Sequence, residues 1–231
     1  MPARFRTLLL VAVLFLPTLF LTACGRSAPP ADAPAVDGRL EDGLRVLTFD
    51  PSRPDARYTI YRGDYVRPEL AGGGPFSLEI AALGVDLRVP TATGEPAFFK
   101  VPDAGVYPFR IGDLAGEIEA LEYRAAAYRE VSAKEAAALL PSLRPFVLDV
   151  RTGREFAAGH LDGATLIPVQ ALSRRLDELA AHRHEPVLIY CATGNRSTVA
   201  GKMLVDAGFT NVINVRRGIA EWAREGLPVV R

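Results

Sequence analysis

The chain has 231 residues, with 27 basic and 27 acidic side chains and a formal net charge of zero. The two signs are interspersed and no cluster of Lys and Arg is present, so the composition argues against a nucleic-acid partner. Only two cysteines occur. Cys24 ends an apolar N-terminal stretch, whereas Cys191 follows an apolar run near the C-terminus.

Residues 1–23 have the pattern of a signal peptide. Arg4 and Arg6 precede the apolar stretch Leu8 to Leu21, and small residues lead to Cys24. This pattern resembles the lipobox of bacterial lipoproteins, which implies that Cys24 becomes the lipidated first residue of the mature chain. The protein is then expected to be lipid-anchored in the bacterial cell envelope and to face the periplasm. The alternative is an uncleaved membrane anchor, although the stretch is shorter than the roughly 20 residues of a membrane-spanning helix.

Residues 24–43 are predicted to be a flexible tether, because they are rich in Ala, Pro, Asp and Gly and show no apolar period. Gly25 follows the cysteine, and the absence of aspartate there favours the outer membrane over the inner one. Removal of residues 1–23 takes away two basic residues and no acid, which leaves 25 basic and 27 acidic residues and a charge of −2. With Cys24 lipidated, Cys191 is the only free thiol.

Residues 44–124 are predicted to form a small antiparallel β-sandwich. Short segments alternate apolar and polar residues, as half-buried strands do, and turn signals separate them. These segments are Arg57–Arg62, Phe76–Ile80, Val85–Val89 and Gly116–Leu121.

The same part of the chain resembles the cupredoxin fold. Tyr61–Val66 is similar to the opening strand and turn of such domains, and Ala104–Ile118 to their closing hairpin. A blue-copper site needs two histidines and a cysteine, whereas no Cys, His or Met occurs between Arg45 and Val131. The resemblance therefore implies a metal-free domain.

Residues 125–231 are predicted to form an α/β domain. Ser132 and Glu135 have the spacing of a capping box that opens a helix from Ala133 to Leu140. Strands are predicted at Phe146–Val150, Pro186–Tyr190 and Asn211–Val215, and further helices at Glu155–Ala158, Ala171–His182, Arg196–Ala207 and Ile219–Arg224. This alternation indicates a mostly parallel sheet with helices on both faces.

Cys191 is the candidate nucleophile. It lies between a predicted buried strand and a predicted helix, where converging backbone amides and the helix dipole favour a thiolate. The alternative is a buried structural cysteine that acts as a small apolar residue. The segment Gly194–Ser197 that follows favours the nucleophile.

Four motifs between Tyr128 and Arg231 resemble, in the same order, those of the rhodanese family of single-domain sulfurtransferases. They are Phe146–Arg151 with Glu155 and Phe156, Gly159–Ala164 with Ile167 and Pro168, the Cys191 loop, and Gly218–Trp222 with Gly226–Val229. The resemblance implies that Cys191 accepts sulfur from a sulfane donor such as thiosulfate. It then passes the sulfur from a persulfide to cyanide or a thiol, without a cofactor.

The resemblance also assigns roles within the loop. Arg196 is the second catalytic residue, which neutralises an anionic donor or holds the loop. The residues assigned to substrate binding are those whose backbone amides are expected to surround the sulfur: Ala192, Thr193, Gly194, Asn195 and Ser197. Ser197 also suits the start of the next helix.

The length of the loop distinguishes sulfur transfer from phosphate or arsenate chemistry. Four residues lie between Cys191 and Arg196, whereas phosphatases built on a cysteine and an arginine need five to fit a tetrahedral oxyanion. The loop therefore argues against phosphate or arsenate chemistry. Ala192 and Thr193 add no positive charge, and Arg217 replaces a common glycine of the family, so thiosulfate is one candidate donor rather than a fixed one.

Two other functions stay open at this point. Cys191 could serve a non-enzymatic periplasmic sulfur or redox relay with a protein partner bound by the sandwich, or the chain could be a partner-binding lipoprotein with an inert α/β domain. In the sulfurtransferase interpretation the sandwich is a spacer or a docking module. The three histidines, His160, His182 and His184, do not predict a metal site. His182 and His184 flank residue 183, but no third ligand accompanies this pair.

Overall fold

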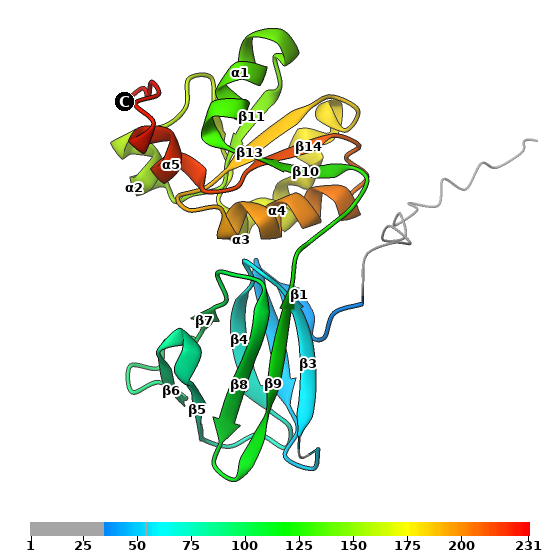
Figure 1. The fold of residues 1–231 in the computed structure, drawn as a ribbon, viewed down its shortest axis with the longest axis vertical. Coiled ribbons are helices and arrows are strands. Elements are labelled where there is room, and N and C mark those ends of the chain that lie inside the picture. Colours follow the sequence, from blue (N-terminus) through cyan, green and yellow to red (C-terminus); the bar gives the residue numbers. More distant parts are fainter. Residues whose placement is uncertain (1–34, 54) are drawn as a thin grey trace, which may run out of the picture.

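The computed structural model describes residues 35–53 and 55–231. A β-sandwich is followed along the chain by an α/β domain, and the two are stacked end to end (Figure 1). The predicted signal peptide, its cleavage site and Cys24 lie outside the described residues. Within them, no helix has both the length and the apolar character needed to cross a membrane.

The sandwich consists of two mixed sheets. One has the strand order β1 (Arg39–Glu41), β2 (Leu44–Phe49), β4 (Tyr65–Leu70) and β7 (Phe99–Lys100). The other has the order β3 (Ala56–Tyr61), β9 (Leu114–Leu121), β8 (Gly105–Ile111), β5 (Phe76–Ile80) and β6 (Val85–Val89). A short 3₁₀ turn, Ala81–Leu83, joins β5 to β6. Aromatic rings that meet edge to face, such as Phe49 and Phe109 at 4.8 Å, fill the space between the sheets.

Two features of the sandwich differ from the prediction. It is not fully antiparallel, because β2 pairs with β4 and β3 pairs with β9 in parallel. The chain crosses from β2 to β3 in the opposite sheet and returns as β4, so β2 and β4 run in the same direction. The sandwich also begins before Leu44, since residues 39–41 of the predicted tether form β1 against β2. The likeness to cupredoxins stays a prediction.

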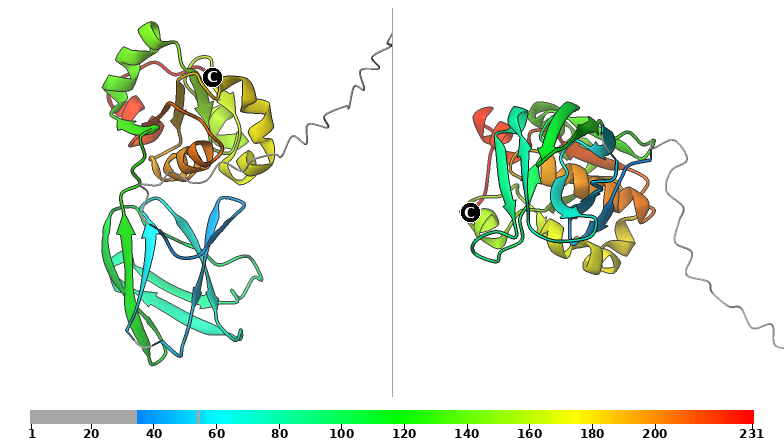
Figure 2. Two further views of the ribbon diagram at one scale, coloured as in Figure 1. Left: turned by 90° about the vertical axis from the view of Figure 1, so that its right-hand side faces the viewer. Right: turned by 90° about the horizontal axis from the view of Figure 1, so that it is seen from below.

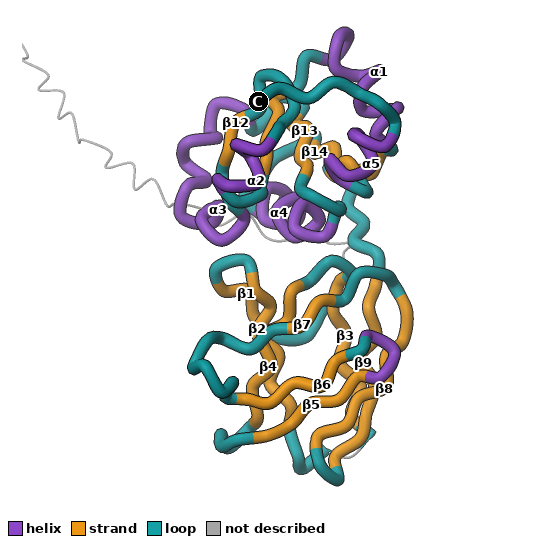
Figure 3. Tube along the Cα trace, turned by 90° about the vertical axis from the view of Figure 1, so that its left-hand side faces the viewer, coloured by secondary structure: helices purple, strands orange, loops and turns teal. Residues whose placement is uncertain are grey.

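The α/β domain has the predicted parallel sheet. Its strand order is β10 (Tyr128–Val131), β14 (Val212–Val215), β13 (Val187–Tyr190), β11 (Phe146–Asp149) and β12 (Thr165–Leu166), and all four pairings are parallel. Its helices are α1 (Ala133–Leu143), α2 (Gly153–Ala158), α3 (Val169–Arg175), α4 (Asn195–Asp206) and α5 (Gly218–Arg224). Helices α1 and α5 pack on one face of the sheet, and α3 and α4 on the other (Figure 3).

Local sequence patterns predicted the positions of these helices well, with one exception. The capping box of Ser132 and Glu135 is present at the start of α1. The single helix predicted from Ala171 to His182 is instead α3 followed by a 3₁₀ segment, Leu176–His182. The two segments separate at Arg175, whose φ of −118° and ψ of 11° do not continue the α-helical hydrogen-bond ladder.

The ends of several sandwich strands lie against α3 and α4 (Figures 1 and 2). Tyr61 of β3 contacts Tyr123, and Tyr123 contacts Tyr128 of β10, with ring centroids 5.1 and 5.0 Å apart. Tyr61 is buried in the same hydrophobic cluster as the residues of α3 and α4. Arg62 is also buried and forms ion pairs with Glu122 and Glu130. The two domains therefore share a packed junction.

Candidate active site

Cys191 directly follows the C-terminal end of β13, the middle strand of the sheet, and comes just before α4. This is the edge at which open α/β sheets place their ligand sites. All four residues of β13 are buried, and the Cys191 side chain is only 1% exposed. A cysteine in this place has a fixed position and little contact with bulk water.

The loop surrounds the sulfur with hydrogen-bond donors. The Gly194 amide donates to the Cys191 Sγ at 3.1 Å, and the Ser197 hydroxyl lies 3.6 Å from the same atom. The Ser197 Oγ also lies 2.9 Å from the Gly194 carbonyl oxygen, so its single hydrogen serves one of the two acceptors at a time. Both donors stabilise negative charge on the sulfur, as a thiolate or a persulfide requires.

The remaining loop residues have other surroundings. The Ala192 carbonyl accepts the Ala220 amide at 3.0 Å, and the side chain of Thr193, an exposed residue, lies 3.3 Å from the Asn195 Oδ1. The Asn195 Nδ2 is buried without a hydrogen-bond partner among the residues described. The structure thus brings Gly194 and Ser197 to the sulfur, whereas it uses Ala192 to fix the loop against α5.

Two glycines give the loop its shape. Gly194 has a φ of +98°, and a Cβ atom there would overlap the backbone of Arg216. Gly218 has a φ of +59°, and a Cβ there would overlap the backbone of Cys191 and Ala192. The close approach of Gly218 lets the Ile219 amide donate to the Cys191 carbonyl at 2.8 Å. Glycine is required at both positions, and Arg217 before the second one stays exposed.

Arg196 points to Glu155 of α2 and forms a bidentate ion pair with it. Its two terminal nitrogens lie 2.8 and 2.6 Å from the two Glu155 oxygens. Glu155 also accepts the Thr152 amide at 3.0 Å and its hydroxyl at 2.8 Å, in a capping box at the start of α2. The hydrogen bond from Arg196 is the main reason that the pKa of Glu155 is lowered to about 2. Both groups are therefore ionised at neutral pH.

A second ion pair supports the neighbouring strand end. Asp149, the last residue of β11, is fully buried and accepts the Arg151 Nη2 at 2.6 Å and its Nε at 2.9 Å. Arg151 donates in turn to the Gly159 carbonyl at 2.7 Å. It thereby fixes the turn at Gly159–Ala164, in which His160 stacks on Phe156 with ring centroids 3.7 Å apart.

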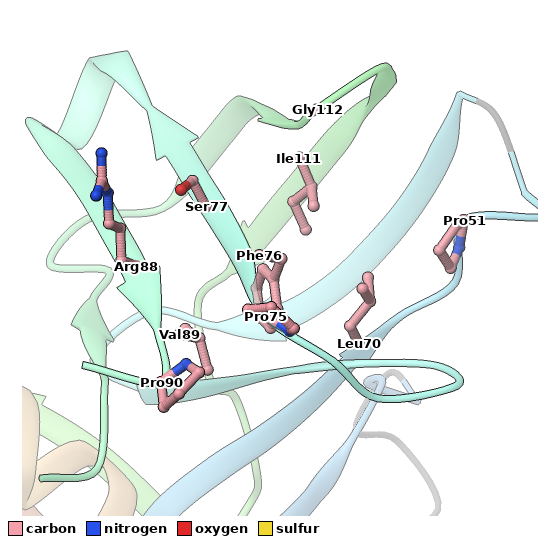
Figure 4. A pocket seen from close by; sticks show the side chains of 10 residues that line it. All are labelled: Pro51, Leu70, Pro75, Phe76, Ser77, Arg88, Val89, Pro90, Ile111 and Gly112. Carbon is pink, nitrogen blue, oxygen red and sulfur yellow. The ribbon is translucent and has the colours of Figure 1, made fainter. Parts of the chain in front are cut away.

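In the described part of the chain, no group of three or more His, Cys, Asp or Glu side chains is placed to hold a metal ion. A separate hollow of about 640 Å³ lies in the sandwich near the β8–β9 turn. Its walls come from both sheets, with Leu70 of β4 and Phe76 of β5 among them (Figure 4). None of the predicted site residues lines it.

One turn of the sandwich packs against the helix that follows the loop, a contact that was not predicted from the sequence. Gly63, in the turn between β3 and β4, has a φ of +89° and packs against α4, so that a Cβ atom there would lie 3.0 Å from the Asn195 carbonyl oxygen. Tyr65 follows two residues later. Burial raises the pKa of its hydroxyl, Arg196 lowers it, and Cys191 and Glu155 raise it further. The turn between β3 and β4 therefore packs against the start of α4.

Comparison with known proteins finds relatives of the α/β domain. Residues 132–225 match the family model of the rhodanese-like domain. A sulfurtransferase of Allochromatium vinosum is 39% identical over 84 residues, which cover 36% of this chain and 77% of the relative. The thiosulfate sulfurtransferase GlpE of Actinobacillus pleuropneumoniae is 32% identical over 102 residues, which cover 44% of this chain and 93% of the relative. A solved rhodanese-related protein of Thermoplasma volcanium is 32% identical, with a TM-score of 0.41 over 45% of this chain and 98% of that one.

Proposed function

This chain belongs to the rhodanese-like domain family, and we propose on that basis that it is a sulfurtransferase whose nucleophile is Cys191. The observation that carries the proposal is the position of the sulfur at the end of β13, with the Gly194 amide 3.1 Å away. Family relatives that carry the names sulfurtransferase and thiosulfate sulfurtransferase support the same reaction class.

The reaction has two displacement steps. The Cys191 thiolate attacks the outer sulfur of thiosulfate, a new S–S bond forms, and the old one breaks with its electron pair leaving on sulfite. Cyanide then attacks the terminal sulfur of the Cys191 persulfide, thiocyanate leaves, and the thiolate is restored. A thiol acceptor reacts in the same way after it loses its proton. No second cysteine and no external oxidant is needed, which suits a chain with a single cysteine in its described part.

Detection of the persulfide tests this proposal. After incubation with thiosulfate, the peptide that contains Cys191 should be one sulfur atom heavier by mass spectrometry. Addition of cyanide should remove that sulfur and release an equal amount of thiocyanate. A Cys191 peptide of unchanged mass, from protein whose thiol still reacts with iodoacetamide, would contradict the proposed reaction.

We further propose that lipid on Cys24 holds the enzyme at the envelope membrane, on its periplasmic side. The support is the sequence of residues 1–24, and two or more acyl chains are enough for stable anchoring. Cys24→Ser should accumulate as an unprocessed precursor, whereas Ser27→Ala, just beyond the site, should be processed normally. Normal cleavage of Cys24→Ser to a periplasmic protein free of the membrane would show that an ordinary signal peptidase acts there.

A further inference from the structure

A polar network lies at the junction of the two domains, next to the start of α4. It consists of Arg62 from the sandwich and of Tyr128, Glu130, Asn214 and Thr198 from the α/β domain. Asn214 is fully buried, and Thr198 is 2% exposed. Burial of a polar side chain costs free energy unless its hydrogen bonds are made, so each contact in this network constrains the next one.

Glu130 is the acceptor at the centre of the network. Arg62 forms an ion pair with it from the sandwich, and the Arg216 Nε lies 3.5 Å from its other carboxylate oxygen. The Tyr128 hydroxyl lies 2.9 Å from the Glu130 Oε1, and the Asn214 Nδ2 lies 3.2 Å from the same atom. Because a carboxylate only accepts hydrogen bonds, it fixes the orientation of the Asn214 amide, with Nδ2 rather than Oδ1 toward it.

This orientation determines where the Thr198 hydroxyl points. The Thr198 Oγ1 lies 3.3 Å from the Asn214 Nδ2 and 2.9 Å from the Gly194 carbonyl oxygen. An amide nitrogen can only donate, so the hydroxyl hydrogen goes to the Gly194 carbonyl. The backbone amide of Thr198 donates to the same oxygen at 3.0 Å. Thr198 therefore occupies both lone pairs of that carbonyl.

The occupied carbonyl leaves the Ser197 hydroxyl available to the sulfur. The Ser197 Oγ lies 2.9 Å from the Gly194 oxygen and 3.6 Å from the Cys191 Sγ, and it has one hydrogen to donate. With the carbonyl filled by Thr198, the sulfur is the acceptor that remains. The sandwich leaves little room for water here, because a Cβ atom on Gly63 would lie 3.2 Å from the Thr198 Cβ.

We propose that Thr198 is a positioning residue of the Cys191 site, which directs the Ser197 hydroxyl to the sulfur and thereby stabilises the thiolate. The proposal rests on the sulfurtransferase function proposed above. It also gives the domain junction a part in that function, because Arg62 and Glu130 hold the Asn214 amide that orients the Thr198 hydroxyl.

The ionisation of Cys191 tests the proposal without sulfur transfer. The ¹³Cβ chemical shift of Cys191 is followed against pH in the full chain, with cysteine labelled at Cβ and the signal identified by its absence in Cys191→Ser. Thr198→Val keeps the shape but removes the hydroxyl, so the Ser197 hydroxyl should turn to the Gly194 carbonyl. The ionisation constant of the thiol should then fall by about tenfold or more, as expected for loss of one hydrogen bond to a charged group. Thr198→Ser, which keeps a hydroxyl, should match the wild type.

A second background and a matched control separate positioning from general damage. In Ser197→Ala protein, Thr198→Val should have no further effect, because no hydroxyl is left to redirect. Thr210→Val is the control, since the Thr210 hydroxyl lies 3.3 Å from the Arg183 carbonyl just before β14, at the opposite end of the parallel strands from Cys191. Should Thr198→Val not fold, Thr198→Ala is measured in its place. An unchanged constant in Thr198→Val, or an equal fall in the Ser197→Ala background, would overturn the role of Thr198.

Sulfur transfer is measured on the same variants. At a pH below the midpoint of the wild-type titration, Thr198→Val should lower kcat/KM for thiosulfate by a factor similar to its fall in ionisation constant, and Thr198→Ser should restore it. If the constant falls in Thr198→Val but no protein transfers sulfur, wild type included, the positioning role stands and the sulfurtransferase proposal fails. If the wild type transfers sulfur and all Thr198 variants ionise alike, the positioning role is wrong and the sulfurtransferase proposal stands.

Discussion

Cys191→Ser should lose thiosulfate:cyanide sulfurtransferase turnover by on the order of 10³-fold or more. A serine hydroxyl is not ionised near neutral pH and forms no persulfide, so neither displacement step can proceed. The fold should persist, because the smaller Oγ can still accept the hydrogen bond that the Gly194 amide now donates to the sulfur at 3.1 Å. Steady-state kinetics together with a thermal melt separate loss of chemistry from loss of structure.

Cys24→Ser is the control for that experiment, because it removes the other cysteine of the chain and leaves the α/β domain untouched. Purified Cys24→Ser protein should turn over thiosulfate at the wild-type rate. Activity that survives in Cys191→Ser would exclude a covalent mechanism through this residue. Activity lost in both variants would instead indicate that damage to the protein, rather than loss of the nucleophile, explains the first result.

Features that depend on neighbouring residues could be predicted from the sequence. The capping box of Ser132 and Glu135 is a local hydrogen-bond pattern, and it is found where the spacing places it. The position of Cys191 between β13 and α4 follows in the same way from an apolar run and a helical period. The pairing of Arg196 with Glu155, 41 residues apart, was not predicted, because no local pattern contains it.

Features that depend on distant contacts could not be predicted. The composition of Arg39–Glu41 is typical of a flexible tether. These residues form a strand because they pair with the free edge of β2. The parallel pairing of β2 with β4 depends on the crossover through β3, whereas the alternation of apolar residues is the same for either direction.

Arg196→Ala should lower kcat/KM for thiosulfate by about ten- to a hundredfold, the effect of about 1.5–3 kcal/mol for a hydrogen bond to a charged group. The guanidinium uses two of its donors on Glu155 and has others left for an anionic donor. Its loss leaves Glu155 and the Cys191 thiolate without a positive partner in the loop, so the dianion should bind less well and KM should rise. A purely structural arginine would instead lower kcat at constant KM.

Glu155→Gln distinguishes these two roles, because it keeps the arginine charge but weakens its anchor. We expect a smaller loss of kcat/KM than in Arg196→Ala and no increase of KM for thiosulfate. Equal losses at unchanged KM in both variants would show that Arg196 only supports the loop.

The dependence of the free energy of unfolding on pH gives an independent check. Because the pKa of Glu155 is lowered from 4.5 to about 2, the ion pair stabilises the folded state above pH 4.5 and this contribution is lost as pH falls toward 2. The stability difference between wild type and Arg196→Ala in urea should therefore be constant from pH 7 to pH 5 and shrink below it, since only the wild type has this carboxylate held ionised by an arginine.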